Sequence, residues 1–152
     1  MRKEGTMRRN LRPEDVARLL AAPKCATLAT YRRDGTVLLS PVWHEWRDGG
    51  FNIWTGGVSE GKVRHLERDP RASLVVAEQA MPYRGLDASG RATLSLDGFH
   101  DVVRRTAARY MSPQEADAFA AEYPEPRTVI RLVPDRIRAW DFKDDAAAAG
   151  KA

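Results

Sequence analysis

The sequence lacks several features that mark common classes of protein. Its 152 residues include one cysteine, Cys25, so an internal disulfide cannot form. No apolar run approaches the ~20 residues that span a bilayer, and the first six residues lack the apolar stretch of a secretory signal. These absences exclude a disulfide-stapled domain, and we expect a cytoplasmic protein with no membrane partner.

Motifs for hydrolysis or nucleotide binding are also missing. The sequence contains no GxSxG, GxxxxGK[ST] or GxGxxG pattern. Its three histidines, His44, His65 and His100, are scattered and form no HxxxH pair, so no metal ligands are predicted. No side chain is assigned a catalytic acid, base or nucleophile role.

The charge is unevenly distributed. The formal net charge is +4, and residues 1–12, with five basic side chains and one acidic one, carry that whole excess. The rest of the chain is neutral, so we expect a solvated basic tail at 1–12 rather than a nucleic-acid-binding face. With 43% hydrophobic and 30% charged residues, the remainder has the balance of one globular domain.

The first half of the chain alternates like a small β-sheet. Pro13-Glu14-Asp15 opens a short amphipathic helix predicted over 13–21. The pattern then predicts a meander of three strands, at 25–31, 36–46 and 51–55, with turns at Asp34-Gly35 and Asp48-Gly49-Gly50.

The second half mixes strands and helices. The capping-box pattern at Ser112–Glu115 marks the start of one helix. The predicted elements are a helix at 62–68, strands at 72–77 and 91–97, helices at 99–110 and 113–122, and strands at 128–133 and 136–142 joined by a tight turn at 134–135. Six or seven strands with late helices favour a mainly β fold, a small antiparallel barrel with short peripheral helices. We expect that domain over 13–142, with a flexible tail at 143–152.

The segment 56–66 has the composition of an anion site. A glycine-bearing loop precedes a helix start, where backbone N–H groups are free, and Lys62 and Arg64 add two cations. Side chains two residues apart point in different directions on a regular helix, so both reach one phosphate only if Lys62 lies at an irregular start. The alternative is a solvated basic helix.

A second segment, Ser40-Pro41-Val42-Trp43, combines a strand break with aromatic residues. Proline removes a donor from the strand ladder, which marks an edge, a bulge or a bend. Trp43 and the nearby Trp46 are able to line a pocket for a flat heterocycle, or they belong to the core.

Taken in order, the segments of this chain resemble a known family. The segments are Ala26-Thr-Leu-Ala-Thr30, Asp34-Gly35, Ser40-Pro-Val-Trp43, Trp54-Thr-Gly56, Lys62-Val-Arg64-His-Leu66, Arg68-Asp-Pro-Arg71 and Pro82-Tyr-Arg-Gly85. They resemble the pyridoxamine-phosphate-oxidase-like split β-barrel flavoproteins over residues 13–142, and in particular the flavin/deazaflavin oxidoreductase group B. The resemblance implies a split antiparallel β-barrel, and a homodimer with cofactor sites at its interface.

The resemblance also implies a set of cofactor-binding residues. In such proteins the Lys-x-Arg segment binds the cofactor phosphate and the strand matching Ser40–Trp43 borders the ring. The resemblance implies that Thr55 and Gly56 flank the ring or ribityl chain, that Arg84 meets an acidic cofactor tail, and that Trp140 closes over the pocket. The full set of residues implied by the match is Ser40, Pro41, Val42, Trp43, Thr55, Gly56, Lys62, Arg64, Tyr83, Arg84 and Trp140. One departure is His65, which stands where relatives often have Asn.

The function implied by the resemblance is an oxidoreductase that transfers hydride from reduced coenzyme F420 to a small electron-poor organic acceptor. The cofactor carries the chemistry in such a protein, which agrees with the lack of a catalytic cluster. Two alternatives stay open: an FMN-dependent reductase, and a non-enzymatic protein that holds a flavin, a deazaflavin or haem, the last through His44, His65 or His100.

Overall fold

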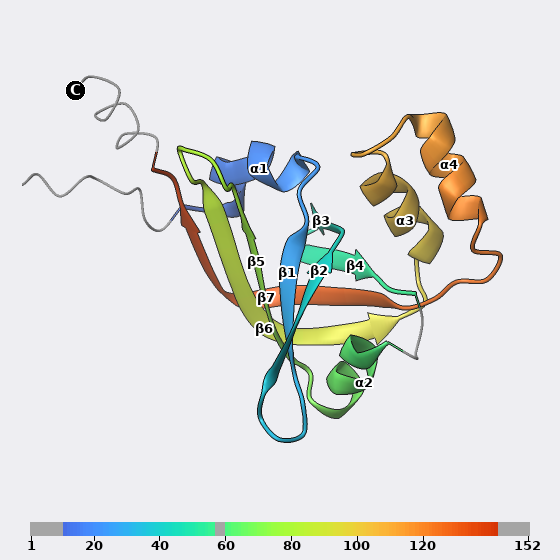
Figure 1. Cartoon of the computed structure of the whole chain (residues 1–152), viewed down its shortest axis with the longest axis horizontal. Coiled ribbons are helices and arrows are strands. Elements are labelled where there is room, and N and C mark those ends of the chain that lie inside the picture. The colour runs from blue at the N-terminus through green and yellow to red at the C-terminus, as the bar shows by residue number, and fades with distance from the viewer. Residues whose placement is uncertain (1–10, 57–59, 143–152) are drawn as a thin grey trace, which may run out of the picture.

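The computed structural model describes residues 11–56 and 60–142 (Figure 1). The predicted tail at 1–12 lies outside these residues apart from Leu11 and Arg12, and so does the predicted tail at 143–152. Within the described part, no helix is long and apolar enough to cross a membrane.

Seven antiparallel strands form one strongly curled sheet, so the predicted mainly β split barrel is confirmed. Its strand order is β2-β1-β5-β6-β7-β4-β3. The strands are β1 (Ala26–Tyr31), β2 (Val37–Val42), β3 (His44–Arg47), β4 (Gly50–Trp54), β5 (Arg71–Ala77), β6 (Gly85–Ser95) and β7 (Val129–Trp140).

The long strands β6 and β7 bend together and carry the sheet around the core (Figure 1). Their register shifts between Ser89 and Gly90, a β-bulge of the kind that bends a strand. Gly90 pairs with Pro134, and a Cβ atom at Gly90 would lie 3.0 Å from the Val133 carbonyl oxygen. The predicted tight turn at 134–135 is therefore wrong, because Pro134 lies inside one continuous strand, at the irregularity where a proline is tolerated.

The predicted single strand at 36–46 is also wrong, because the chain breaks at Trp43 into β2 and β3. These consecutive strands lie at opposite edges of the sheet: β2 pairs with β1, whereas β3 pairs with β4, which in turn pairs with β7. Pro41 lies in β2, where the missing N–H suits an edge strand. The break at Trp43 therefore links the two edges of the curled sheet.

The helices follow the sequence pattern closely. The predicted helix at 13–21 is present as a 3₁₀ turn, η1 (Pro13–Val16), followed by α1 (Ala17–Ala21). The others are α2 (Gly61–Arg68), α3 (Phe99–Ala107) and α4 (Pro113–Ala121). The Ser112 hydroxyl caps α4 by accepting the Glu115 N–H at 3.2 Å, as the capping pattern predicts.

Two apolar clusters hold the fold together. The larger cluster fills the inside of the sheet, where side chains such as Leu28, Leu74 and Ile130 are fully buried and α1 adds Leu19. A smaller aromatic cluster packs α3 and α4 against the end of β4 through Trp54. The helices thus cover the ends of the barrel and leave the outer face of β1, β2 and β5 uncovered.

Candidate functional site

The start of α2 presents a cation and a backbone N–H to the same anionic group. The Gly56 N–H donates to the Glu60 carboxylate (2.6 Å to Oε1), and the Lys62 ammonium pairs with the same carboxylate. The Lys62 side chain is 17% exposed. Arg127 donates to the Gly56 carbonyl oxygen, which fixes the strand end at this loop. Because phosphate and carboxylate accept hydrogen bonds in the same way, this cradle fits an anion.

Arg64, two residues further on, lies elsewhere on the helix. Its exposed side chain lines an open, arginine-rich depression together with Arg32, Arg33 and Arg68. Side chains at i and i+2 of a helix point in different directions, as expected from the sequence. Of the two predicted phosphate ligands, Lys62 is therefore half-buried at the cradle, whereas Arg64 is exposed in the depression. Asp34 and Glu67 line the same depression, so the formal charges of its lining side chains sum to +2.

His65 attaches α2 to the sheet. Its Nδ1 atom is hydrogen-bonded to the buried Thr30 hydroxyl of β1 at 3.0 Å. Burial of the ring and the neighbouring Arg68 lower the pKa of His65, so the imidazole is neutral at pH 7. The residue that departs from the family pattern thus has a structural contact of its own.

The four residues Ser40 to Trp43 lie at the edge strand β2 and its end. Ser40 is half-buried opposite Leu28, Pro41 is exposed opposite Thr27, and Val42 is buried. Gly61, the first residue of α2, lies beside the Leu38 side chain of β2. The fold therefore brings the anion cradle next to this strand.

Trp43 belongs to the aromatic cluster. Its ring stacks on Tyr110 at a centroid distance of 4.6 Å. The same ring makes an edge contact with Trp54 and a tilted contact with Phe119. Trp46 packs against Phe51 in the main core. The aromatic side chains thus fix the break between β2 and β3 by packing, which was the alternative to a pocket lining.

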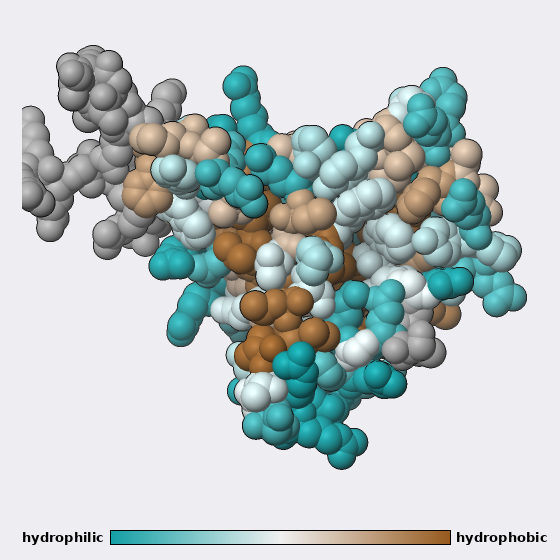
Figure 2. Space-filling model, in the orientation of Figure 1, coloured by the Kyte–Doolittle hydropathy of each residue, from teal (hydrophilic) through white to brown (hydrophobic). Residues whose placement is uncertain are grey.

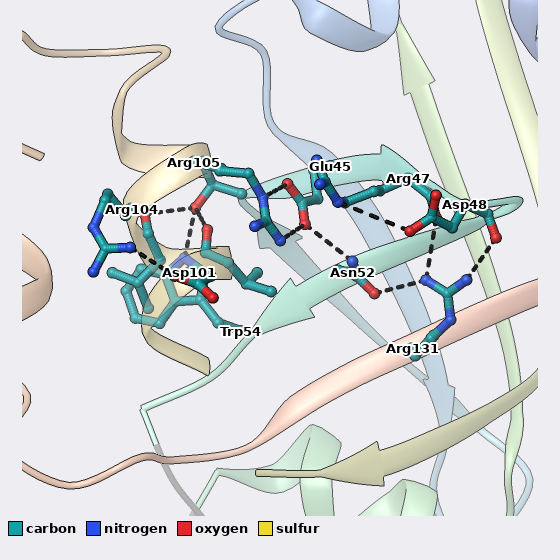
Figure 3. Close-up of polar contacts among 12 residues, drawn as sticks. Glu45, Arg47, Asp48, Asn52, Trp54, Asp101, Arg104, Arg105 and Arg131 are labelled. Atoms are coloured by element: carbon teal, nitrogen blue, oxygen red, sulfur yellow. Dashed lines mark hydrogen bonds and ion pairs between the residues drawn. The ribbon is translucent and has the colours of Figure 1, made fainter. Parts of the chain in front are cut away.

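A buried polar network holds β3 against α3 just after Trp43 (Figure 3). The Glu45 carboxylate accepts two hydrogen bonds from Arg105 of α3, at 2.7 and 2.8 Å, and one from Asn52 at 3.0 Å. Burial disfavours the ionised form of Glu45, but the hydrogen bonds from Arg105 and Asn52 outweigh it and lower its pKa. Arg131 of β7 extends the network to the Asn52 side chain and the Asp48 carbonyl oxygen.

Thr55 and Gly56 continue from β4 to the cradle. Thr55 is buried, and both its N–H and its hydroxyl donate to the Thr128 carbonyl oxygen, at 3.0 and 3.4 Å. This double contact fixes the backbone immediately before Gly56. Thr55 therefore orients the loop, and Gly56 offers its N–H to the anion.

The other predicted site residues form a separate group at the β5–β6 turn. Arg84 makes a bidentate ion pair with Glu78, and Tyr83 is 46% exposed with a positive φ of 54°. The Trp140 ring lies against Gly85, where a Cβ atom would collide with it. The Arg138 guanidinium lies over the Trp140 ring, 5.1 Å from its centroid.

The two groups lie near opposite ends of β7. Gly56 follows Thr55, whose N–H donates to Thr128 just before β7 begins, whereas Trp140 ends β7 and pairs with Gly85. The twelve residues of β7 lie between them. One copy of the chain therefore does not bring Lys62 together with Arg84 and Trp140.

Comparison with known families covers almost the whole described domain. Residues 13–141 match the pyridoxamine 5'-phosphate oxidase family. The chain belongs to that family. No curated protein matches the sequence.

Solved structures that share this fold include proteins named for different roles. A conserved hypothetical protein from Mycobacterium tuberculosis is 25% identical over 90% of this chain and 88% of its own, with a TM-score of 0.77. An F420 reductase is 24% identical over 79% and 93%, with a TM-score of 0.61. The haem storage protein HutZ from Vibrio cholerae is 16% identical over 84% and 93%, with a TM-score of 0.65. The family match thus establishes the family of this chain, and the solved structures show that proteins named for different roles share its fold.

Sequence reasoning missed one residue of the cradle in this oxidase-family domain. Glu60 directly contacts both Gly56 and Lys62, but an acidic residue in a basic loop gives no sign that it folds back on the loop's own N–H. In the sequence, the one sign of a contact between Glu60 and Lys62 is that Glu60 stands two residues before Lys62. The contact depends on the turn of the chain into α2, which the sequence pattern does not specify.

Proposed function

We propose that the chain is an oxidoreductase that binds coenzyme F420 and transfers hydride to a small electron-poor organic acceptor. Membership of the pyridoxamine 5'-phosphate oxidase family and the likeness to an F420 reductase support a flavin-type cofactor. The observation that carries the proposal is the cradle of Gly56 and Lys62, a preformed site for one phosphate group. When bound, the cofactor supplies the hydride chemistry, and the chain supplies binding and orientation.

In this proposal, the residues around the cradle have distinct roles. The Lys62 ammonium and the Gly56 N–H bind the phosphate, replacing the Glu60 carboxylate as their partner. Arg64, in its basic depression, attracts the anionic cofactor from solution. The edge strand Ser40–Val42, with its unpaired backbone groups, borders the ring, and the stack of Trp43 on Tyr110 keeps that strand end in place.

We further propose a homodimer with the cofactor between the two copies. The outer face of β1, β2 and β5 exposes Leu39 by 63%, Val37 by 40% and Val75 by 37%, which gives an apolar patch at the centre of Figure 2. Leu38, next to Leu39 in β2, contacts Gly61 at the start of α2, and Val75 lies two residues before Ala77, which pairs with Gly85. A twofold axis through the patch brings the cradle of one copy toward Tyr83, Arg84 and Trp140 of the other, which is how two distant groups complete one site.

The first experiment is a parallel titration of the protein with F420 and FMN, followed by cofactor fluorescence. We expect micromolar binding of F420 and weak binding of FMN, and oxidation of reduced F420 by an electron-poor acceptor. A preference for FMN favours an FMN-dependent reductase instead. Binding of neither cofactor refutes both forms of the proposal.

The Lys62→Ala variant tests the cradle itself. Loss of a hydrogen bond to a charged group costs about 1.5–3 kcal/mol, so Kd for F420 rises roughly ten- to a hundred-fold. The Arg18→Ala variant, which removes an exposed cation from α1, keeps the wild-type Kd. An unchanged Kd in Lys62→Ala removes this residue from the cofactor site.

Haem binding is the second candidate, because a haem storage protein shares the fold. Among the described residues, the hydrogen bonds occupy Nε2 of His44 and His100 and Nδ1 of His65, so Nε2 is open in His65 alone of the three. His44 keeps an open Nδ1, but this residue is 1% exposed. A haemin titration that gives a Soret shift in the wild type, and none in His65→Ala, identifies a haem protein. No shift in either protein rejects this candidate.

A further inference from the structure

A second cavity lies beside α1, away from α2 and the cofactor cradle (Figure 1). It opens between α1 and the corner where β3 meets the residues after α3, with a volume of about 250 Å³. Its walls are mainly apolar, formed by Ala17, Leu20 and Ala21 of α1 and by Trp46 of β3. One cation, Arg109, lines the same cavity. The size suits a molecule of a few to about a dozen non-hydrogen atoms.

Arg109 is half-buried without an acidic partner among residues 11–56 and 60–142. Its Nη1 atom donates to the His44 carbonyl oxygen at 2.7 Å, and no described carboxylate pairs with it. The acidic residue in its neighbourhood, Glu45, already holds Arg105 in a bidentate pair. Burial lowers the pKa of Arg109, which reflects the cost of holding the charge there.

A half-buried guanidinium beside apolar walls, with one hydrogen bond to the described residues, favours an organic anion as its partner. Arg presents its donors in a planar fork that matches a carboxylate. Glu14 lines the rim of the cavity, but its side chain is exposed and forms no ion pair with Arg109 in the described structure. Residues 1–10 carry four basic side chains and one acidic one, so charge complementarity disfavours them as the occupant.

We propose that this cavity binds a small organic monocarboxylate, with the carboxylate on Arg109 and the apolar body between Trp46 and the α1 helix. The site uses none of the residues of the cofactor cradle, and the proposal does not depend on the proposed function. An apolar body excludes water from the Arg109 pair, which strengthens the charged hydrogen bonds. The site thus takes carboxylic acids and rejects neutral or cationic molecules of the same shape.

The test uses benzoate as the probe, titrated into the full-length protein by calorimetry, with benzamide and benzylamine as neutral and cationic analogues. We expect saturable binding of benzoate, and binding of both analogues weaker by roughly ten-fold or more, because they lose a charge-assisted pair. Equal affinity for benzoate and benzamide, or no benzoate binding, overturns the proposal.

Three variants locate the site. Arg109→Gln keeps a donor for the His44 carbonyl oxygen but loses the charge, and benzoate affinity falls roughly ten- to a hundred-fold. Ala17→Leu fills the cavity from α1 and leaves Arg109 in the sequence. We expect this variant to abolish benzoate binding, so the test stays decisive if Arg109→Gln does not fold. Arg104→Gln, an exposed arginine of α3 paired with Asp101 and Asp117, keeps wild-type affinity. Unchanged benzoate affinity in Ala17→Leu refutes this location.

Discussion

At the scale of single residues, Glu60 has the contacts that a bound phosphate needs. Its carboxylate accepts a hydrogen bond from the Gly56 N–H and pairs with the Lys62 ammonium, so an incoming phosphate competes with this carboxylate. Glu60→Gln removes the competing charge and keeps an acceptor for Gly56. We expect Kd for F420 to fall by about three- to ten-fold.

Glu122→Gln is the control for Glu60→Gln, because Glu122 lies exposed at the end of α4 and lines neither the cradle nor the arginine-rich depression. Its fluorescence titration with F420 keeps the wild-type Kd. Weaker binding in Glu60→Gln contradicts the competition, and shows instead that Glu60 orients Lys62 for the cofactor.

His44 gives the fold a dependence on pH. Its side chain is 1% exposed, and burial together with the nearby Arg109 lowers its pKa from 6.5 to about 4. Between these two values the unfolded chain binds more protons than the folded chain, so the free energy of unfolding decreases as pH falls through this range. The loss reaches about 3 kcal/mol near pH 4, and His44 contributes no such loss above pH 7.

Urea unfolding at several pH values from 7 to 4 measures this effect. Acidic residues also lose stability in acid, so the quantity that tests His44 is the difference between the wild type and His44→Gln. We expect the variant to have a flatter dependence of the free energy of unfolding on pH. Parallel curves for the two proteins contradict the assignment.

At the scale of elements, the Glu45–Arg105 pair joins β3 to α3 (Figure 3). Arg105→Met leaves the Glu45 carboxylate, 5% exposed, without its main partner. Because Arg105 itself is partly exposed and Asn52 still donates, we expect a loss of about 2 kcal/mol in the free energy of unfolding. In the Glu45→Gln background, Arg105→Met lowers the free energy of unfolding by less than about 1 kcal/mol, because no buried charge is left without a partner.

Arg104 provides the comparison within the same helix. It is exposed and paired with Asp101 and Asp117, so Arg104→Met costs only about 0.5 kcal/mol or less. Chemical denaturation of the four variants measures all these values. Equal losses for Arg104→Met and Arg105→Met argue against a special role of the buried network.

The elements that the sequence predicted well are those whose pattern is local. The start of α4 at Ser112-Pro113 and the helix over 13–21 depend on capping and on the spacing of apolar residues along one face. The errors at Trp43 and at Pro134 have the opposite origin. A break between β2 and β3, and a proline at a bulge opposite Gly90, depend on which strands become neighbours.

At the scale of the whole molecule, the proposed homodimer depends on the apolar patch of Val37, Leu39 and Val75. Leu39→Glu puts a charge at the centre of this patch, where an interface would bury it without a partner. We expect the variant to be monomeric and to lose most of its affinity for F420, because Tyr83, Arg84 and Trp140 of the second copy no longer reach the cradle.

Sedimentation of the wild type and the variant, with and without F420, tests this expectation. Leu96→Glu changes a leucine that is similarly exposed (55%) outside the patch, and this control stays dimeric. A dimeric Leu39→Glu protein places the interface elsewhere. A monomeric variant that binds F420 as tightly as the wild type shows that one copy forms the whole site.

The sequence by itself determined the mainly β class, the positions of most elements and the family, because alternation, caps and ordered short motifs are properties of neighbouring residues. It also predicted the cation Lys62 beside a glycine loop. Only the tertiary structure decided that Glu60 shares the cradle, that Trp43 packs on Tyr110, and that the cradle and Trp140 lie near opposite ends of β7. These facts depend on contacts between distant residues, and the curl of the sheet, not the local pattern, fixes such contacts.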